Sequence, residues 1–167
     1  QAKHPLLRGI NTRFDVPHSR YNTIPVAALE DADVTVLIES DTGEMHMAVS
    51  ADQFSIVYFQ GHPEYDANSL LKEYKREVNR YILGDREDYP PHPEHYFSSD
   101  VAAFVDDYGQ LVRQAQQQGK TIPSFPEEQI TPLVDNTWGD TGKAIVNNWL
   151  GLVYQKADYS RPNYFET

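Results

Sequence analysis

The chain contains no cysteine among its 167 residues. Without a thiol it can form no disulfide, no thiolate metal site and no cysteine nucleophile of its own. It also lacks an apolar run of about 18 residues, the length that a membrane-spanning helix requires. The first residues do not read as a signal peptide. We therefore expect neither a membrane span nor secretion, and we expect a cytoplasmic protein.

Positive charge is also scarce, because 14 lysines and arginines stand against 25 aspartates and glutamates, a formal net charge of −11. Nucleic acid and anionic membranes are bound by basic surfaces, so we expect neither as a partner. An acidic balance of this kind ordinarily serves solubility. The composition that remains, 40% hydrophobic and 12% aromatic, is typical of a folded globular protein, and the length is sufficient for one domain with a real core.

The most informative stretch covers residues 56–66, I-V-Y-F-Q-G-H-P-E-Y-D. Its first four residues are apolar and predict a short buried strand. Gly61 allows the backbone to turn, and Pro63 ends the strand because it lacks an N–H group. In an extended segment His62 and Glu64 lie on the same side. A carboxylate beside an imidazole is the base–orienter half of a catalytic triad, and the nucleophile is missing.

The rest of the chain predicts a β-meander followed by three amphipathic helices. The predicted strands are 34–38, 45–49 and 56–59, with a hairpin turn at 40–44. The predicted helices span 70–82, 101–118 and 138–155, separated by proline-rich loops at 85–99 and 121–132, and residues 158–167 are predicted to form a tail. The predicted core stripe of the second helix consists of Phe104, Val105, Tyr108, Leu111, Val112 and Ala115. The fold class is therefore α/β.

Three further groups have a functional and an ordinary interpretation. Ser19 and Arg20, in P-H-S-R-Y, could donate hydrogen bonds to an anion, or could simply form a surface turn. Arg76 lies on the polar face of the helix predicted at 70–82, and such faces are usually only solvated. A second His-Pro-Glu, at residues 92–94, carries metal-ligating side chains but has no helical spacing, so an ordered loop is favoured over a metal site.

Three blocks of sequence agree with one family. Residues 60–76, Q-G-H-P-E-Y-D-A-N-S-L-L-K-E-Y-K-R, are similar to T-G-H-P-E-Y-D-A-x-T-L-x-x-E-Y-x-R. Residues 6–21, L-L-R-G-I-N-T-R-F-D-V-P-H-S-R-Y, are similar to L-x-R-G-F-D-x-x-F-x-x-P-H-S-R-Y. Residues 138–155, W-G-D-T-G-K-A-I-V-N-N-W-L-G-L-V-Y-Q, are similar to W-R-x-H-G-x-x-L-x-x-N-W-L-x-x-x-V-Y-Q. All three patterns belong to the homoserine O-succinyltransferases, the acyltransferases that open methionine biosynthesis, so the chain resembles the C-terminal part of such an enzyme.

This resemblance implies a role for four residues. His62 matches the catalytic histidine of the family, and Glu64 matches the acidic member of its Cys-His-Glu triad. Arg76 matches the arginine that binds the homoserine carboxylate, and Ser19 matches a serine at the substrate site. No metal and no bound cofactor are implied, because the acyl group comes from succinyl-CoA, or acetyl-CoA in an acetyl-specific member, as a co-substrate.

The resemblance also implies what lies outside the chain. The cysteine of the family, its oxyanion-hole loop, its active-site lysine and the residue that selects succinyl over acetyl donors all precede the matching stretch. We expect residues 1–157 to be the C-terminal portion of a class I glutamine-amidotransferase-like (flavodoxin-like) three-layer fold, with an insertion near 100–132. The expected partners are L-homoserine, an acyl-CoA, the N-terminal half of the same enzyme and a second copy in a homodimer.

Three alternatives remain open at this stage. The chain could belong to a homoserine O-acetyltransferase of the same family. It could belong to a related Cys-His-Glu glutamine amidotransferase, although the P-H-S-R-Y loop and Arg76 favour the acyltransferase. It could also be a non-catalytic fragment, which the missing nucleophile favours.

Overall fold

A computed structural model describes residues 4–29 and 32–157. The chain divides into two compact units: unit 1 contains residues 1–64 and 137–167, and unit 2 contains residues 65–136. The tail predicted at 158–167 lies outside the described residues. Within the described ranges, no helix combines the length and the apolar character that crossing a membrane requires.

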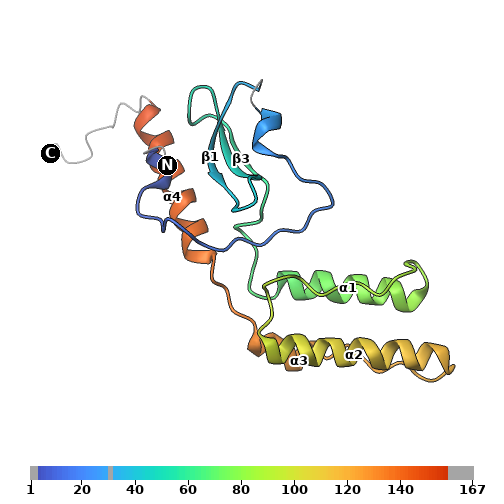
Figure 1. Cartoon of the computed structure of the whole chain (residues 1–167). Helices are drawn as coiled ribbons and strands as arrows, with labels where there is room; N and C mark the ends of the chain where they lie inside the picture. The colour runs from blue at the N-terminus through green and yellow to red at the C-terminus, as the bar shows by residue number, and fades with distance from the viewer. Residues whose placement is uncertain (1–3, 30–31, 158–167) are drawn as a thin grey trace. The chain divides into compact units, whose positions relative to one another are not determined.

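Unit 1 contains the predicted meander, formed by β1 (Val34–Glu39), β2 (Met45–Ser50) and β3 (Val57–Phe59). The order is β1-β2-β3 with antiparallel pairing throughout, and Val57 lies opposite Val49 (Figure 1). The short 3-10 helices η1 (Pro5–Leu7) and η2 (Val26–Leu29) precede the sheet. A turn closes between β2 and β3 because the Asp52 carboxylate accepts hydrogen bonds from the amides of Phe54 and Ser55.

The helix α4 (Gly139–Lys156) completes unit 1 and packs on one face of the sheet. Alternation along β2 sends two side chains toward this helix. The buried core of the unit consists of Leu6, Leu37, Met47, Val49 and Ile145. The indole of Trp149 adds a specific anchor, since its Nε1–H donates to the carbonyl of Phe54 at 2.8 Å.

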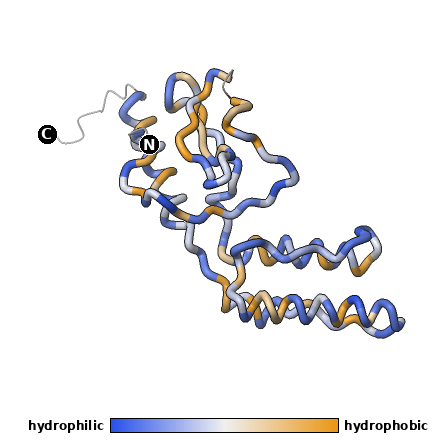
Figure 2. The backbone as a smooth tube through the Cα atoms, in the orientation of Figure 1, coloured by the Kyte–Doolittle hydropathy of each residue, from blue (hydrophilic) through white to orange (hydrophobic). Residues whose placement is uncertain are grey.

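Unit 2 is helical and contains α1 (Ser69–Leu83), α2 (Ser99–Gln117), the single-turn α3 (Glu127–Ile130) and the 3-10 turn η3 (Thr131–Leu133). After α1 and after α2 the chain runs back along the helix it has just left, so the two long helices point in the same direction (Figure 1). Polar and apolar residues alternate along both helices (Figure 2). This is the periodicity of helices that bury one face.

The core of unit 2 forms where the apolar faces of α1 and α2 meet. Its buried members are Leu71, Tyr74, Val78, Val101, Val105, Tyr108, Val112, Ile130 and Val134. The return segments also contribute, because the Tyr96 hydroxyl donates to the Ala67 carbonyl and the Tyr108 hydroxyl donates to the Pro123 carbonyl. Residues 100–132, predicted to be an insertion, therefore supply about half of the buried residues of this core.

Several sequence predictions are corrected by this structure. The segment 56–59 was expected to be buried, but Ile56 and Phe59 are 51% and 37% exposed, because β3 is the last strand of the described sheet. On α2, Phe104 and Leu111 were expected in the core and are exposed. The 121–132 segment is not only a loop, since it contains α3 and η3.

The fold class is confirmed at the coarse level only. The described residues combine helices with one small antiparallel sheet, which is an α/β composition. The prediction of a glutamine-amidotransferase-like sheet concerns strands that would pair beyond this meander, and it stays a prediction.

Candidate active site

The predicted base–orienter pair forms directly after β3. His62 Nδ1 and Glu64 Oε1 lie 2.9 Å apart, so the carboxylate holds one ring nitrogen of the imidazole. The side chain of His62 is 34% exposed and that of Glu64 is 67% exposed. The pair therefore stands at the surface of unit 1, where a group from outside the chain can reach the ring.

Charge stabilises this arrangement. Slight burial raises the pKa of Glu64, but its hydrogen bond to His62 and its proximity to the imidazole lower it, and the net pKa lies below the usual range. A glutamate that stays ionised can stabilise an imidazolium and fix the ring tautomer. The expected chemical role of Glu64 is compatible with this geometry.

Backbone contacts fix the position of His62 from three sides of unit 1. The His62 N–H donates to the carbonyl of Pro17 at 2.8 Å, and the Gln60 N–H donates to the carbonyl of His46 at 2.9 Å. From α4, Gly142 packs on Pro63 so closely that a Cβ atom would stand 2.8 Å from the Pro63 carbonyl oxygen. The three blocks of the family pattern, far apart in sequence, therefore meet around His62.

Two other histidine rings lie beneath Gly61. A Cβ atom on Gly61 would stand 3.0 Å from the ring of His46 and 3.1 Å from the ring of His18. Only glycine lets the backbone before His62 approach these rings so closely. The ring centroids of His18 and His46 are 5.7 Å apart in an edge-to-face arrangement.

Both of these histidines favour the neutral form. His46 is only 3% exposed, and burial, with smaller contributions from His18 and Arg20, lowers its pKa to about 4. Burial and the Arg20 guanidinium lower the pKa of His18, with a further contribution from His62, while Glu44 acts in the opposite direction. Sequence reasoning noted the His18 imidazole only as part of the P-H-S-R-Y loop and gave no role to His46. The close approach of Gly61 and the packing of the two rings bring both to the site.

The P-H-S-R-Y loop reaches the site through Pro17, but its two polar side chains differ. Ser19 is exposed, as a substrate-contacting hydroxyl would need to be. Arg20 is mostly enclosed, and its Nη2 donates to the carboxylate of Glu44. The loop arginine is therefore held in an ion pair through Nη2, and Ser19 is the exposed hydrogen-bond donor of this loop.

Arg76 lies on α1 in unit 2, with a side chain that is 62% exposed. Its Nε donates to Glu77 at 3.3 Å, and the same glutamate also binds Arg80 and Arg86, each at 3.2 Å. Most of the Arg76 side chain is exposed, so it is accessible to a planar anion. The contacts of Glu77 were not predicted. The pair of Glu77 and Arg80, three residues apart on one helix, is nevertheless a pattern that the sequence shows.

The second His-Pro-Glu copy does not form a comparable pair. His92 Nδ1 lies 3.3 Å from the carbonyl oxygen of Pro93, its Nε2 lies 3.8 Å from Asp106, and its ring packs against Phe97. Glu94 is exposed, and the acidic neighbour of the His92 ring is Asp106. Among the described residues, no group of three or more metal-ligating side chains occurs, so this loop gives no support to a metal site.

A histidine oriented by a carboxylate has the geometry of the base and its orienting acid in a catalytic triad, and it does not by itself specify the reaction. Comparison with known proteins makes the assignment specific. The family model described as homoserine O-succinyltransferase matches residues 1–159. The chain therefore belongs to the homoserine O-succinyltransferase family.

Individual relatives agree with the family match. The homoserine O-succinyltransferase of Methylococcus capsulatus is 57% identical over 97% of this chain, and that of Nitrosococcus oceani is 52% identical over 95%. The corresponding protein of Methylobacter tundripaludum is 53% identical over 95% of the chain. These alignments cover only 46%, 45% and 45% of the relatives, so the chain spans less than half of their length and corresponds to their C-terminal part.

Proposed function

We propose that this chain is the C-terminal part of a homoserine O-succinyltransferase, which transfers the succinyl group of succinyl-CoA to the hydroxyl of L-homoserine through a cysteine thioester. The single observation that carries this proposal is the pairing of His62 with Glu64 at 2.9 Å, inside one of the three blocks that match the family. The cysteine is proposed to lie in the part of the relatives that this chain does not match, since the chain itself has none.

The proposed reaction has two acyl transfers with the same base. Glu64 holds Nδ1, so Nε2 of His62 takes the thiol proton, and the thiolate attacks the succinyl carbonyl carbon. The bond from that carbon to the coenzyme A sulfur breaks, and the imidazolium returns the proton to the departing thiolate. In the second transfer His62 takes the homoserine hydroxyl proton, the oxygen attacks the thioester, and the cysteine leaves and is reprotonated.

Arg76 and Ser19 are proposed to bind the amino-acid substrate. A guanidinium binds a carboxylate through two parallel hydrogen bonds, and the exposed outer edge of Arg76 meets this requirement. Ser19 supplies an exposed hydroxyl next to the loop that anchors the His62 backbone. Neither role requires a metal or a bound cofactor.

The fold proposal accompanies the functional one. We propose that unit 1 is the C-terminal portion of a class I glutamine-amidotransferase-like (flavodoxin-like) domain, in which the strands of the remaining part of the polypeptide extend the meander. The succinyl group is preferred over acetyl because the matched relatives are named succinyltransferases. The residue expected to select the donor lies outside the chain.

The test uses a full-length fusion, in which the unmatched part of the Methylococcus capsulatus enzyme precedes this chain. We expect the fusion to convert succinyl-CoA and L-homoserine to O-succinylhomoserine and the chain alone to be inactive. Glutamine hydrolysis is assayed in parallel, because hydrolysis without acyl transfer would indicate an amidotransferase. Succinyl transfer by the cysteine-free chain on its own would refute the proposal.

A further inference from the structure

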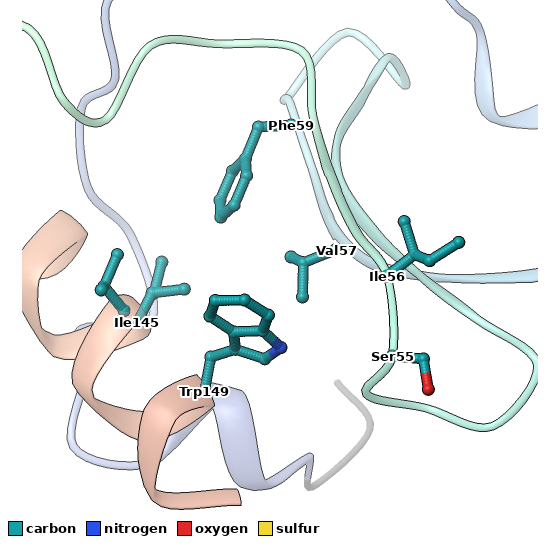
Figure 3. Close-up of a pocket in the computed structure, with 7 residues that line it drawn as sticks. Ser55, Ile56, Val57, Phe59, Ile145 and Trp149 are labelled. Carbon is teal, nitrogen blue, oxygen red and sulfur yellow. The ribbon is translucent and has the colours of Figure 1, made fainter. Parts of the chain in front are cut away.

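Recognition of an amino-acid carboxylate requires a cation, and the apolar groove of unit 1 supplies none. Figure 3 shows this groove, of about 370 Å³, with Val57 and Phe59 from β3 and Ile145 and Trp149 from α4 around one open space. None of its lining residues carries a charge. Placing a carboxylate against hydrocarbon costs free energy, because the charge loses its water without gaining a partner. The cations suited to the proposed substrate lie instead in unit 2.

Three guanidinium groups of unit 2 converge on the carboxylate of Glu77. Nε of Arg76 donates to Oε1 at 3.3 Å. Nη1 of Arg80 and Nη1 of Arg86 both donate to Oε2, each at 3.2 Å. Three cations around one anion leave a surplus of positive charge, in a chain whose formal net charge is −11. A surplus of this sign attracts an anion to this place on the surface.

Glu77 is better enclosed than the arginines that it contacts. Its side chain is 16% exposed, against 62% for Arg76 and 31% for Arg86. Partial burial raises the pKa of Glu77, but the hydrogen bond to Arg76, the charge of Arg80 and the hydrogen bond to Arg86 lower it, and the net pKa lies below the ordinary value. The glutamate therefore stays ionised and can hold a guanidinium through charge-assisted hydrogen bonds.

The contact through Nε decides which edge of the Arg76 guanidinium remains for a substrate. A guanidinium can bind a carboxylate with two parallel hydrogen bonds, either through Nε and one Nη or through both Nη atoms. Glu77 occupies the edge that contains Nε. The edge formed by Nη1 and Nη2 is left, at the end of a side chain that is largely exposed. The geometry therefore favours a carboxylate that approaches Arg76 end-on.

Arg86 is itself fixed by the loop that follows α1. Its Nε donates to the carbonyl of Asp88 at 2.8 Å. The next residue, Tyr89, packs edge-to-face on Tyr81 of α1, with ring centroids 5.3 Å apart. Gly109 of α2 lies so close to the same ring that a Cβ atom would stand 2.8 Å from it. Both long helices therefore fix this loop, and the predicted insertion contributes to its support.

We propose that Glu77 is a positioning residue for homoserine recognition: it holds Nε of Arg76 so that Nη1 and Nη2 meet the substrate carboxylate end-on, and Arg86 in turn holds Glu77. Arg80 adds charge from the same helix, at the three-residue spacing common in exposed helix pairs. The inference rests on the proposed function for the identity of the substrate. It adds what orients Arg76, and it gives the predicted insertion a part in substrate binding through the loop that carries Arg86.

Glu77→Ala in the full-length fusion removes the group that holds Arg76. The KM for L-homoserine should rise roughly three- to tenfold, because an unheld guanidinium loses rotamer freedom when it binds the carboxylate. Acyl-enzyme formation from succinyl-CoA should be unchanged. Glu127→Ala is the matched control, because its carboxylate pairs with Lys75 of α1. An unchanged KM with Glu77→Ala, equal rises with both variants, or equal losses in both half-reactions would overturn the proposal.

A double-variant cycle shows whether Glu77 acts through Arg76. Arg76→Lys alone removes the planar pair of donors that Glu77 positions. Adding Glu77→Ala to Arg76→Lys should therefore raise the KM for homoserine little further, although each single substitution raises it. If the KM of the double variant rises by the product of the two single effects, Glu77 acts independently of Arg76 and the positioning role is wrong.

Nuclear magnetic resonance tests the same contact without catalysis. The heteronuclear NOE of the Arg76 Nε–H group is measured in the chain alone, and Arg76→Lys identifies the signal. The NOE should fall in Glu77→Ala and, by a smaller amount, in Arg86→Ala, because a released side chain moves more on the picosecond-to-nanosecond timescale. Arg13, which pairs with Asp41 in unit 1, is the internal reference. An NOE of Arg76 that stays the same in both variants would overturn the proposal.

Failure of this inference and failure of the proposed function give different results. If the fusion transfers no succinyl group while the Arg76 NOE falls in Glu77→Ala, the proposed function fails and the positioning of Arg76 by Glu77 stands. If the fusion is active while neither the KM for homoserine nor the NOE responds to Glu77→Ala, the proposed function stands and the inference is wrong.

Discussion

The two compact units of the chain differ in how completely they bury their own apolar surface. In unit 2 the helices α1 and α2 face each other, and core residues such as Leu71, Val78 and Val112 are fully buried. In unit 1 the sheet and α4 share a smaller core, and Tyr58 and Phe59 on the last described strand stay partly exposed. Among the described residues, unit 1 exposes nine large apolar side chains and unit 2 exposes four, so the difference between the units is one of degree.

Polar groups show the same contrast. Among the described residues, the buried side-chain nitrogen and oxygen atoms without a hydrogen-bond partner all belong to unit 1. They are carried by His18, Arg20, His46 and Gln60, which lie around the backbone that leads to His62. Such atoms lower stability and tend to collect where function imposes a constraint. The proposed chemistry therefore lies in unit 1, the unit that contains these atoms.

The largest effect is expected from Glu64→Gln in the full-length fusion. The amide keeps the shape of the carboxylate but removes the charge that supports the imidazolium, so kcat should fall on the order of a thousandfold or more. Glu94→Gln is the matched control in the second His-Pro-Glu copy, where the acidic neighbour of the histidine is Asp106. Turnover and thermal midpoint are measured for both. Loss of turnover with Glu94→Gln in a folded protein, and tolerance of Glu64→Gln, would mean that the pair is assigned to the wrong copy.

The next largest effect concerns the difference between the two cores. Leu71→Ala in the chain alone should lower the free energy of unfolding by about 2 to 5 kcal/mol, because Leu71 is fully buried in unit 2. Phe59→Ala should cost about 1 kcal/mol or less, since this side chain is partly exposed. Urea denaturation of both variants measures the difference. A Phe59 effect as large as that of Leu71 would show that unit 1 is already complete.

A smaller effect is expected for Arg76→Lys in the fusion. Lysine keeps the charge but loses the planar pair of donors, so the KM for homoserine should rise roughly tenfold, the cost of about 1.5 kcal/mol for one lost charge-assisted hydrogen bond. Formation of the acyl-enzyme from succinyl-CoA should be spared. Arg80→Lys is the control, because Arg80 contacts the same Glu77. Equal losses in both half-reactions would indicate a structural role for Arg76.

The last prediction is a pH dependence that His46 contributes to stability. Its pKa is about 4 in the folded chain and near 6.5 in the unfolded chain, so the unfolded state binds the proton first. Stability should therefore fall as the pH decreases from 6.5 toward 4, by at most roughly 1.4 kcal/mol per pH unit from this group. His18, whose pKa is also lowered, acts in the same direction.

Replacing His46 by phenylalanine keeps an aromatic ring beside Phe14 and Phe59 while removing the titration. The urea midpoint of His46→Phe should vary less between pH 6.5 and 4 than that of the unchanged chain. His92→Phe, in unit 2, provides the control. An identical pH profile for His46→Phe and the unchanged chain would show that His46 does not carry the dependence.

Features that depend on residues close together in the sequence were predicted, and features that depend on residues far apart were not. The three strands and the three long helices depend on local periodicity, and these were predicted. The contact between His62 and Glu64 was also predicted, but from an extended segment, whereas Pro63 and Glu64 lie in a turn. The exposure of Ile56 depends on which strands are absent beside it, and no local pattern contains that information. The prediction that Phe104 is buried was wrong for a related reason. Helical spacing indicates which apolar residues share one side of the helix, but not how many of them the core covers.

The candidate site shows the same limit. Burial of His46 follows from its place on β2, but its contact with Gly61 requires the strand pairing and the P-H-S-R-Y loop together. The ion pair between Arg20 and Glu44 links residues 24 positions apart. Neither of these two contacts can be predicted from the spacing of residues along the sequence. The roles of Ser19 and Arg76 came from resemblance to a family and stay predictions.

The central claim is that unit 1 provides the base for a nucleophile located in the rest of the polypeptide. The most direct measurement is peptide mass mapping of the fusion after incubation with succinyl-CoA in the absence of homoserine. We predict a succinyl group on a cysteine that precedes this chain, absent from the His62→Ala fusion. A succinyl group on Ser19 or any other residue of the chain, or undiminished labelling of that cysteine in the His62→Ala fusion, would contradict the account.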